Sequence, residues 1–295
     1  MTYVRKILFG LTSIIILQLF GNIFNTQYKG RDNTMSLVVP CVASEQQCLM
    51  LFLRSLADCT VFPDESILVI SGIGSNEKFW NNFIASYNIP NLRLITREQN
   101  FTQDSNRNVG ASASKYAHIS FFDCDDYLHP QRFEILKAVF REQVQVDHVL
   151  HTFSDGPPSS EKLGTIITYS ILYSPADLRQ NFFLQARNDS SYWSWCCAFM
   201  PKDDYTTRVH NGWGTMKRDV FNKIPQVRGL LPAVEDSIHN SKIIREGYNV
   251  IVLKDSLGLY LQGRRNTSSG QKDCSVFQHS PSLSRVTNHP LPRTA

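Results

Sequence analysis

The sequence predicts an α/β fold, in which a mostly parallel sheet is flanked by helices. Over residues 36–150, short apolar runs alternate with segments in which apolar residues recur at helical spacing. Such alternation is typical of parallel strands joined by crossover helices. Three of the apolar runs end at or near Pro40, Ser71 and Asp123. Because open α/β sheets bind ligands outside the carboxyl ends of their strands, we expect the functional site near these three residues.

In the first half of the chain, each expected strand is followed by an expected helix. Strands are predicted where apolar residues are bounded by turn-forming residues, and helices where the apolar period is three to four residues. The strands are expected at 36–42, 66–71, 91–96 and 117–122, and the helices at 45–58, 78–87, 104–117 and 130–145. Pro130 suits the first turn of the last helix, where a missing backbone N–H costs no hydrogen bond.

The second half is less regular. Strands are expected at 146–153, 164–173 and 249–253, and helices at 218–223 and 235–246. The aromatic segment Tyr192-Trp-Ser-Trp195 is expected to pack in the core or in a lid. Residues 263–295 are rich in Arg, Ser, Asn and Pro, which predicts a flexible tail.

Composition excludes few classes of function. The 295 residues, 42% of them hydrophobic, suffice for one large domain or two small ones with a proper core. A formal net charge of +4 without any basic block argues against a nucleic-acid partner. The seven cysteines are odd in number and lack the paired spacing of a zinc site. We expect Cys41, Cys48 and Cys59, in or beside apolar segments, to be small buried thiols.

The N-terminal segment predicts a membrane anchor. Residues 7–24 are almost wholly apolar, near the lower limit of the ~17 to 25 residues that span a bilayer. A cleaved signal peptide is the alternative, but no Ala-x-Ala-like site follows the run. We therefore expect a single-pass protein with a cytoplasmic tip and signal-anchor over 1–26 and a short stem over 27–35. Sequons at Asn100, Asn188 and Asn266 are compatible with residues after the anchor facing the ER or Golgi lumen of a eukaryotic cell.

Three carboxylates follow the fourth strand pattern within four residues. In a strand, alternate side chains share a face, so Asp123 and Asp125 point to one side and Cys124 to the other. Such a pair suits Mg²⁺ or Mn²⁺ carrying a phosphate, because hard cations prefer oxygen ligands. The alternative is an acidic turn that caps the helix after Pro130, and Asp126 is expected to have that structural role.

Three stretches become informative when they are taken in order. They are Ser36-Leu-Val-Val-Pro40, Asn106-Arg-Asn-Val-Gly110 with Phe121-Phe-Asp-Cys-Asp-Asp126, and Gly212-Trp-Gly214 followed by Val234-Glu-Asp236. Together they resemble the GT-A fold glycosyltransferases, specifically the family-2-like inverting enzymes. The resemblance implies a GT-A (Rossmann-like) domain over 36–262. Its expected halves are a nucleotide-sugar-binding half (36–150) and an acceptor and catalytic half (151–262).

The resemblance implies a donor site at one edge of the sheet. By similarity, Asp125 coordinates a Mn²⁺ or Mg²⁺ ion that bridges the diphosphate of a nucleotide sugar, and Asp123 contacts the ribose or the metal through water. The charge that develops on a nucleoside diphosphate leaving group needs such a fixed cation. Arg107 is expected to contact the diphosphate or a carboxylate of the Asp123-Cys-Asp125 motif (DxD). The alternative is a surface arginine on an amphipathic helix. The remaining donor-binding residues are expected to be Pro40, Val42 and Ser71.

The resemblance also implies an acceptor site. Asp236 matches the family's general base, which removes the proton of the acceptor hydroxyl as it attacks the anomeric carbon. The alternative is an acidic pair in the first turn of a helix, stabilised by the helix N-terminus. Glu235 and Trp213 are expected at the acceptor subsite, because aromatic faces stack on sugar rings. For Trp213 the alternative is core packing.

The sequence also departs from the family pattern. Asn106 stands where alanine is usual, and Ser71-Gly72 stands where acidic residues usually contact the nucleotide base. The segment Tyr260-Leu-Gln-Gly-Arg-Arg265 lacks the family's histidine, so a third metal ligand is unassigned. The candidate substitutes are His279 and His289, and Arg264 and Arg265 could instead close over the diphosphate.

The expected function is transfer of a hexosyl or pentosyl group from a nucleotide-sugar donor in a metal-dependent, inverting reaction. The expected acceptor is a glycan, glycoprotein, glycolipid or other hydroxyl compound. A catalytically inactive nucleotide-sugar or glycan-binding protein on the same fold is the alternative, suggested by Ser71-Gly72 and the absent histidine. A nucleotidyltransferase or phosphohydrolase that uses the same carboxylates is a third hypothesis.

Overall fold

The computed structural model describes residues 32–180, 209, 211–226, 235–261, 264–265 and 272–274. The chain divides into two compact units, Met1–Asn33 and Thr34–Ala295, and the fold below is that of the second. The expected anchor over 1–26 lies outside the described residues, as does the stem up to residue 31. Within the described part of the chain, no helix is long and apolar enough to cross a bilayer.

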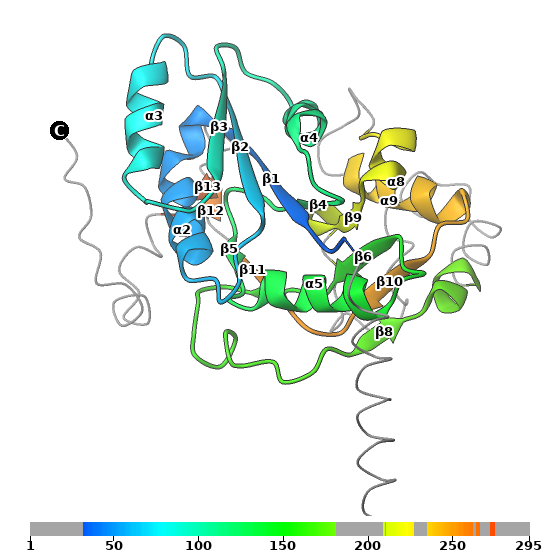
Figure 1. Cartoon of the computed structure of the whole chain (residues 1–295). Coiled ribbons are helices and arrows are strands. Elements are labelled where there is room, and N and C mark those ends of the chain that lie inside the picture. The colour runs from blue at the N-terminus through cyan, green and yellow to red at the C-terminus, as the bar shows by residue number, and fades with distance from the viewer. Residues whose placement is uncertain are drawn as a thin grey trace, which may run out of the picture. The chain divides into compact units, whose positions relative to one another are not determined.

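An eight-stranded sheet forms the centre of the domain (Figure 1), with the strand order β3-β2-β1-β4-β9-β6-β10-β8. Its strands are β1 (Met35–Val42), β2 (Glu65–Ser71), β3 (Leu92–Arg97), β4 (His118–Phe121), β6 (His148–His151), β8 (Ile171–Tyr173), β9 (Thr215–Lys217) and β10 (Val250–Leu253). The first four pair in parallel, as β6 and β10 do, whereas β9 and β8 pair with their neighbours in antiparallel fashion. The predicted α/β fold with a mostly parallel sheet is therefore confirmed.

Helices and two short 3₁₀ turns pack against this sheet. They are η1 (Ala43–Glu45), α2 (Gln46–Ala57), α3 (Glu77–Ala85), α4 (Gln103–Ala113), α5 (Arg132–Glu142), η2 (Asn211–Trp213), α8 (Arg218–Lys223) and α9 (Glu235–Arg245). Figure 1 shows α2 and α3 on one side of β1 to β3 and α4 on the other. Side chains of β1 alternate between the two faces of the sheet. Leu37 and Val39 pack in the core that contains α2 and α5, whereas Val38 packs in the core that contains α4, α8 and α9.

Two small sheets were not predicted from the sequence. One consists of β5 (Tyr127–Leu128), β11 (Gly258–Tyr260) and β7 (Ser154–Asp155), and the other of β12 (Arg264–Arg265) and β13 (Lys272–Asp273). Strands of two or three residues contain too few positions to show a period. The strand expected at 164–173 is wrong except for its last three residues, which form β8. The segment 192–195 lies outside the described residues.

A disulfide corrects two expectations. Cys48, in the first turn of α2, is bonded to Cys274, which lies 226 residues later. Cys48 is therefore not a free thiol, and the tail expected to be flexible from residue 263 is fixed to the domain at Cys274. The bond lies in a buried apolar cluster whose other members are Leu51, Tyr127, Leu259 and Leu261. Cys41 and Cys59 are buried free thiols, as predicted.

Candidate active site

The site begins with the close packing of α4 on the sheet, which Gly110 permits. A Cβ atom at Gly110 would lie 2.4 Å from Val38 Cγ1 and 3.1 Å from Val69 Cγ2, closer than side chains can approach. Arg107 lies one helical turn before Gly110 and is completely buried.

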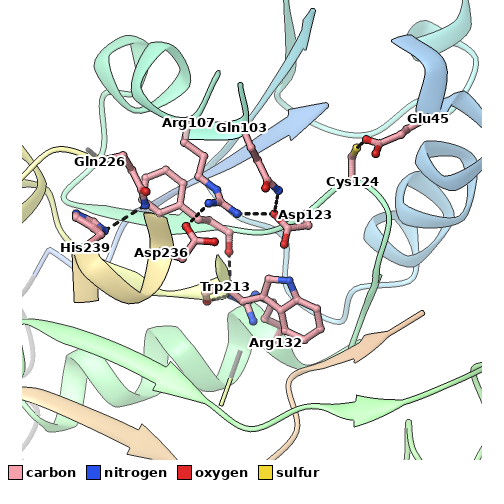
Figure 2. Close-up of polar contacts among 11 residues, drawn as sticks. Glu45, Gln103, Arg107, Asp123, Cys124, Arg132, Trp213, Gln226, Asp236 and His239 are labelled. Atoms are coloured by element: carbon pink, nitrogen blue, oxygen red, sulfur yellow. Dashed lines mark hydrogen bonds and ion pairs between the residues drawn. The ribbon is translucent and has the colours of Figure 1, made fainter. Parts of the chain in front are cut away.

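Arg107 joins two carboxylates from distant parts of the chain (Figure 2). Its Nη2 donates to Asp123 Oδ1 over 2.6 Å, and its Nη1 donates to Asp236 Oδ1. Asp123 is only 7% exposed, and the same oxygen also accepts a hydrogen bond from the Gln103 side chain. One guanidinium thus compensates two carboxylates away from water, an arrangement that is stable only while all the partners are present. The structure brings together three of the predicted site residues, Arg107, Asp123 and Asp236.

Gly212 lies against this charged group. A Cβ atom at this position would be 2.8 Å from Arg107 Nη2, 2.9 Å from Asp236 Oδ2 and 3.1 Å from Asp123 Oδ2. Any side chain at this position would displace at least one of the three charged groups. The glycine is therefore required because η2 passes directly beside the ion pairs.

Trp213 has a different position from the one expected. Its ring is completely buried and stacks on Phe122, with 4.5 Å between the ring centroids. Gly258 allows this packing, because a Cβ atom there would lie 2.7 Å from Trp213 Cζ3. The structure contradicts the prediction that Trp213 lines the acceptor subsite, because a ring without exposed surface belongs to the core.

Arg132 fixes the turn that carries Gly212 and Trp213. It is completely buried, and its Nη2 donates to the backbone oxygen of Trp213 over 2.8 Å and to that of Phe121 over 3.3 Å. Burial lowers the pKa of Arg132 to about 9. Arg132 thus ties η2 to the end of β4, the strand that Asp123 follows.

A cavity of about 210 Å³ opens at the carboxyl ends of β1 and β4. It is lined by Pro40, Cys41, Val42, Glu45, Gln103, Asn106, Cys124 and Asp125. Three of these residues, Pro40, Val42 and Asp125, were predicted to bind the donor or its metal. Two carboxylates and no lysine or arginine are among the described lining residues. Burial, and then the negative charge of Asp125, raise the pKa of Glu45 to about 7.

The three aspartates after β4 can be compared with the needs of a divalent cation. Asp123, Asp125 and Asp126 each offer an oxygen within 4.8 Å of the others. Asp126 Oδ1 accepts a hydrogen bond from the backbone N–H of Leu261 over 3.0 Å, and Asp126 is almost fully buried, which fits a structural role. Asp125 instead lines the cavity. The residues present fit a hard cation bound through Asp125, with Asp123 beside it.

Ser71 serves the protein scaffold and not the cavity. Its side chain is fully buried, and its hydroxyl accepts hydrogen bonds from Asn106 Nδ2 over 3.0 Å and from the backbone N–H of Phe101 over 3.3 Å. The prediction that the Ser71 side chain binds the donor is therefore wrong in this structure. Ser71 and Asn106, which both depart from the family pattern, are partners in one contact that joins β2 to α4.

Several predicted residues cannot be placed. The side chains of Glu235, Arg264 and Arg265 lie outside the described part of the structure, and so do the whole residues His279 and His289. The third metal ligand therefore stays unassigned.

Sequence reasoning also missed some residues of the site. Cys41, Glu45 and Cys124 offer ligand atoms within 4.8 Å of one another, and Gln103 contacts Asp123. Glu45 was read only as the start of an amphipathic helix. The pairing of β1 with β4, which sets Val38 opposite Phe121, is the signal that would have placed the two cysteines side by side.

Comparisons with known proteins bear on the same region. The sequence profile described as Glycosyl transferase family 2 matches residues 36–204, a range that includes Arg107, Asp123 and Asp125. A comparison with curated proteins finds no match.

Solved structures share the fold at low sequence identity. The S. aureus TarS 1-349 structure has a TM-score of 0.54 and 18% identity, over 78% of this chain and 60% of that one. TarS 1-349 in complex with UDP-GlcNAc has a TM-score of 0.51 and 18% identity, over 77% of this chain and 58% of that one. The mannosyltransferase PcManGT from Pyrobaculum calidifontis, in complex with GDP-Man and Mn²⁺, has a TM-score of 0.50 and 13% identity, over 84% of this chain and 65% of that one. This chain thus covers less than two thirds of the length of each.

Proposed function

The chain belongs to glycosyl transferase family 2, and on this premise we propose that it is a metal-dependent inverting glycosyltransferase. The observation that carries the proposal is the Arg107 guanidinium, which holds Asp123 and Asp236 together next to the cavity that Asp125 lines. Gln103 connects the two regions, because it donates to Asp123 and also lines the cavity. The carboxylate proposed to bind the donor and the carboxylate proposed as the base therefore both contact Arg107.

The cavity is the proposed site of the nucleoside diphosphate. The described lining of the cavity includes two carboxylates, of Glu45 and Asp125, and no lysine or arginine, so this lining would not offset the charge of a diphosphate. A Mn²⁺ or Mg²⁺ ion held by Asp125 and Asp123 would supply the positive charge that the leaving diphosphate needs. The complexes of TarS with UDP-GlcNAc and of PcManGT with GDP-Man and Mn²⁺ support a donor of this class.

Asp236 is the proposed general base. The acceptor oxygen attacks the anomeric carbon, the bond from that carbon to the diphosphate breaks, and Asp236 takes the proton of the acceptor hydroxyl. Arg107 orients this carboxylate through Oδ1, while Oδ2 lies beside Gly212. A single displacement of this kind inverts the configuration of the anomeric carbon.

We also propose that residues 1–26 anchor the protein and that the catalytic domain faces an oxidising lumen. The disulfide between Cys48 and Cys274 supports this location, because such bonds persist in secretory compartments and are rare in the cytosol. The acceptor is proposed to be a glycan, glycoprotein or glycolipid hydroxyl, which that compartment presents.

A screen of nucleotide sugars with Mn²⁺ tests the proposal. A donor present at about 100 times its Kd stabilises the folded state by about 2.7 kcal/mol, which a thermal shift detects. We expect one donor class to give this shift and to release a nucleoside diphosphate when an acceptor is present. Asp125→Ala is expected to lose the Mn²⁺-dependent shift, whereas Asp219→Ala, an exposed aspartate on α8, keeps it.

The other outcomes identify the other functions. A shift without turnover would indicate an inactive binding protein, the alternative that Ser71-Gly72 and the absent histidine suggest. Release of pyrophosphate or orthophosphate would indicate a nucleotidyltransferase or phosphohydrolase. If no nucleotide sugar binds with or without Mn²⁺, the proposed donor site is wrong.

A further inference from the structure

We propose that Cys41, Glu45 and Cys124 form a binding site for a thiophilic divalent cation such as Zn²⁺, distinct from the three aspartates. The ligand atoms of these three residues lie within 4.8 Å of one another. The proposal concerns metal binding itself and does not depend on the glycosyltransferase activity.

The pairing of two strands brings the cysteines together. β1 and β4 are parallel neighbours, and Val38 lies opposite Phe121. Cys41 follows Val38 by three residues in β1, and Cys124 follows Phe121 by three residues in the turn after β4. Both are free thiols, 3% and 2% exposed.

Glu45 completes the group from the next element of the chain. It ends η1, directly before α2, and its Oε2 accepts a hydrogen bond from Cys124 Sγ over 3.3 Å (Figure 2). Two sulfur atoms and a carboxylate oxygen are three of the four ligands of a tetrahedral zinc site. A water molecule would supply the fourth ligand.

Ligand chemistry separates this site from the neighbouring aspartates. Thiolates favour Zn²⁺ and other thiophilic metals, whereas carboxylates alone suit Mg²⁺ and Mn²⁺. Coordination replaces each S–H bond with a metal–sulfur bond and releases one proton per thiol. Because Cys41 and Cys124 line the cavity assigned to the donor, a bound Zn²⁺ ion would share that cavity with the donor, a consequence that rests on the proposed function.

Cadmium is a suitable probe, because Cd²⁺ bound to thiolates gives a charge-transfer absorption in the ultraviolet. The experiment uses the full chain with Cys196→Ser and Cys197→Ser, two cysteines that lie outside the described residues. No donor is added. We expect the absorption to saturate at one equivalent of Cd²⁺ and to persist in excess Mg²⁺.

Single variants locate the site. Cys41→Ser and Cys124→Ser are each expected to weaken Cd²⁺ binding at least ~tenfold. Glu45→Gln is expected to weaken binding while it retains the sulfur charge-transfer band. Cys59→Ser is the matched control, because Cys59 is also a buried free cysteine but does not belong to this group. Far-UV circular dichroism verifies that each variant is folded.

Three results would overturn the proposal. The first is Cd²⁺ binding that is unchanged in both Cys41→Ser and Cys124→Ser. The second is an absence of the charge-transfer band, or its loss when Mg²⁺ is added. The third is a thiol titration of the denatured protein that finds one free thiol instead of the expected three, which would show that Cys41 and Cys124 form a disulfide. Because no donor is present, none of these results depends on whether the protein transfers sugar.

Discussion

The contact between Gly212 and the Arg107 ion pairs predicts a specific effect of Gly212→Ala. The new methyl group would lie 2.8 Å from Arg107 Nη2 and 2.9 Å from Asp236 Oδ2, where ordinary contacts begin at about 3.4 Å. The turn or the charged groups must therefore move by roughly half an ångström. Overpacking of this kind costs about 1–3 kcal/mol of unfolding free energy.

Gly212→Ala should also lower activity while the protein remains folded. A displacement of about 1 Å in a reacting group can cost ~100-fold in rate, and Asp236 is one of the groups that the new methyl group would contact. We expect Gly212→Ala to lower kcat by between ~10-fold and ~100-fold at a temperature where the protein remains folded. Urea unfolding measures the stability, and release of nucleoside diphosphate under saturating donor and acceptor measures kcat.

Gly214→Ala is the matched control. It adds the same methyl group two residues later, where the new atom would lie 2.5 Å from His148 Cε1 and away from the carboxylates. This variant is expected to lose a similar amount of stability and to keep kcat within ~threefold of the wild type. Equal kcat values for the two variants would refute the claim that Gly212 maintains the geometry of the charged group.

Three further predictions concern stability. Arg107→Met leaves two carboxylates without their buried cation, so it should lower the unfolding free energy by about 3–5 kcal/mol in urea titrations, and a loss under 1 kcal/mol would contradict the pairing. Burial lowers the pKa of His148 to about 3 and that of His239 to about 4. Below pH ~6.5 the unfolded chain therefore binds more protons than the folded protein, and the unfolding free energy decreases as the pH is lowered. The slope, at most about 1.4 kcal/mol per pH unit for each histidine, should decrease in His148→Gln, and an unchanged slope would exclude His148 as a source. Replacing Cys48 and Cys274 with alanine should cost about 2–5 kcal/mol relative to the oxidised wild type, and equal stability would show that the bond contributes nothing.

Local sequence patterns predicted the helices and strands that are long enough to show a recognisable pattern. Strand 36–42 and the helix after it were found within a few residues of β1 and α2, because the strand is an unbroken apolar run and the helix shows its period over several turns. β9 has only three residues, and its antiparallel place between β4 and β6 depends on the rest of the sheet. No local pattern could supply that place.

In the site, too, local motifs predicted some residues, whereas the positions of others depend on tertiary contacts. Arg107, Asp123 and Asp236 could be selected by their motifs, and the structure puts them in contact across 129 residues of sequence. The burial of Trp213 could not be predicted, because it follows from its packing on Phe122 and from the absence of a side chain at Gly258. Ser71 was misjudged for a related reason. Its partner, Asn106, comes from a different element.

The central claim is that Asp236 is a general base, and one comparison tests it most directly. Asp236 and Asp219 are each the second residue of a helix, α9 and α8, so replacing either with asparagine removes a first-turn carboxylate. Asp236→Asn is expected to lower kcat by about 10²- to 10⁴-fold while the Kd for the nucleotide-sugar donor changes little, and Asp219→Asn should leave both values unchanged. If the folded Asp236→Asn protein transfers sugar at the wild-type rate, Asp236 is not the base.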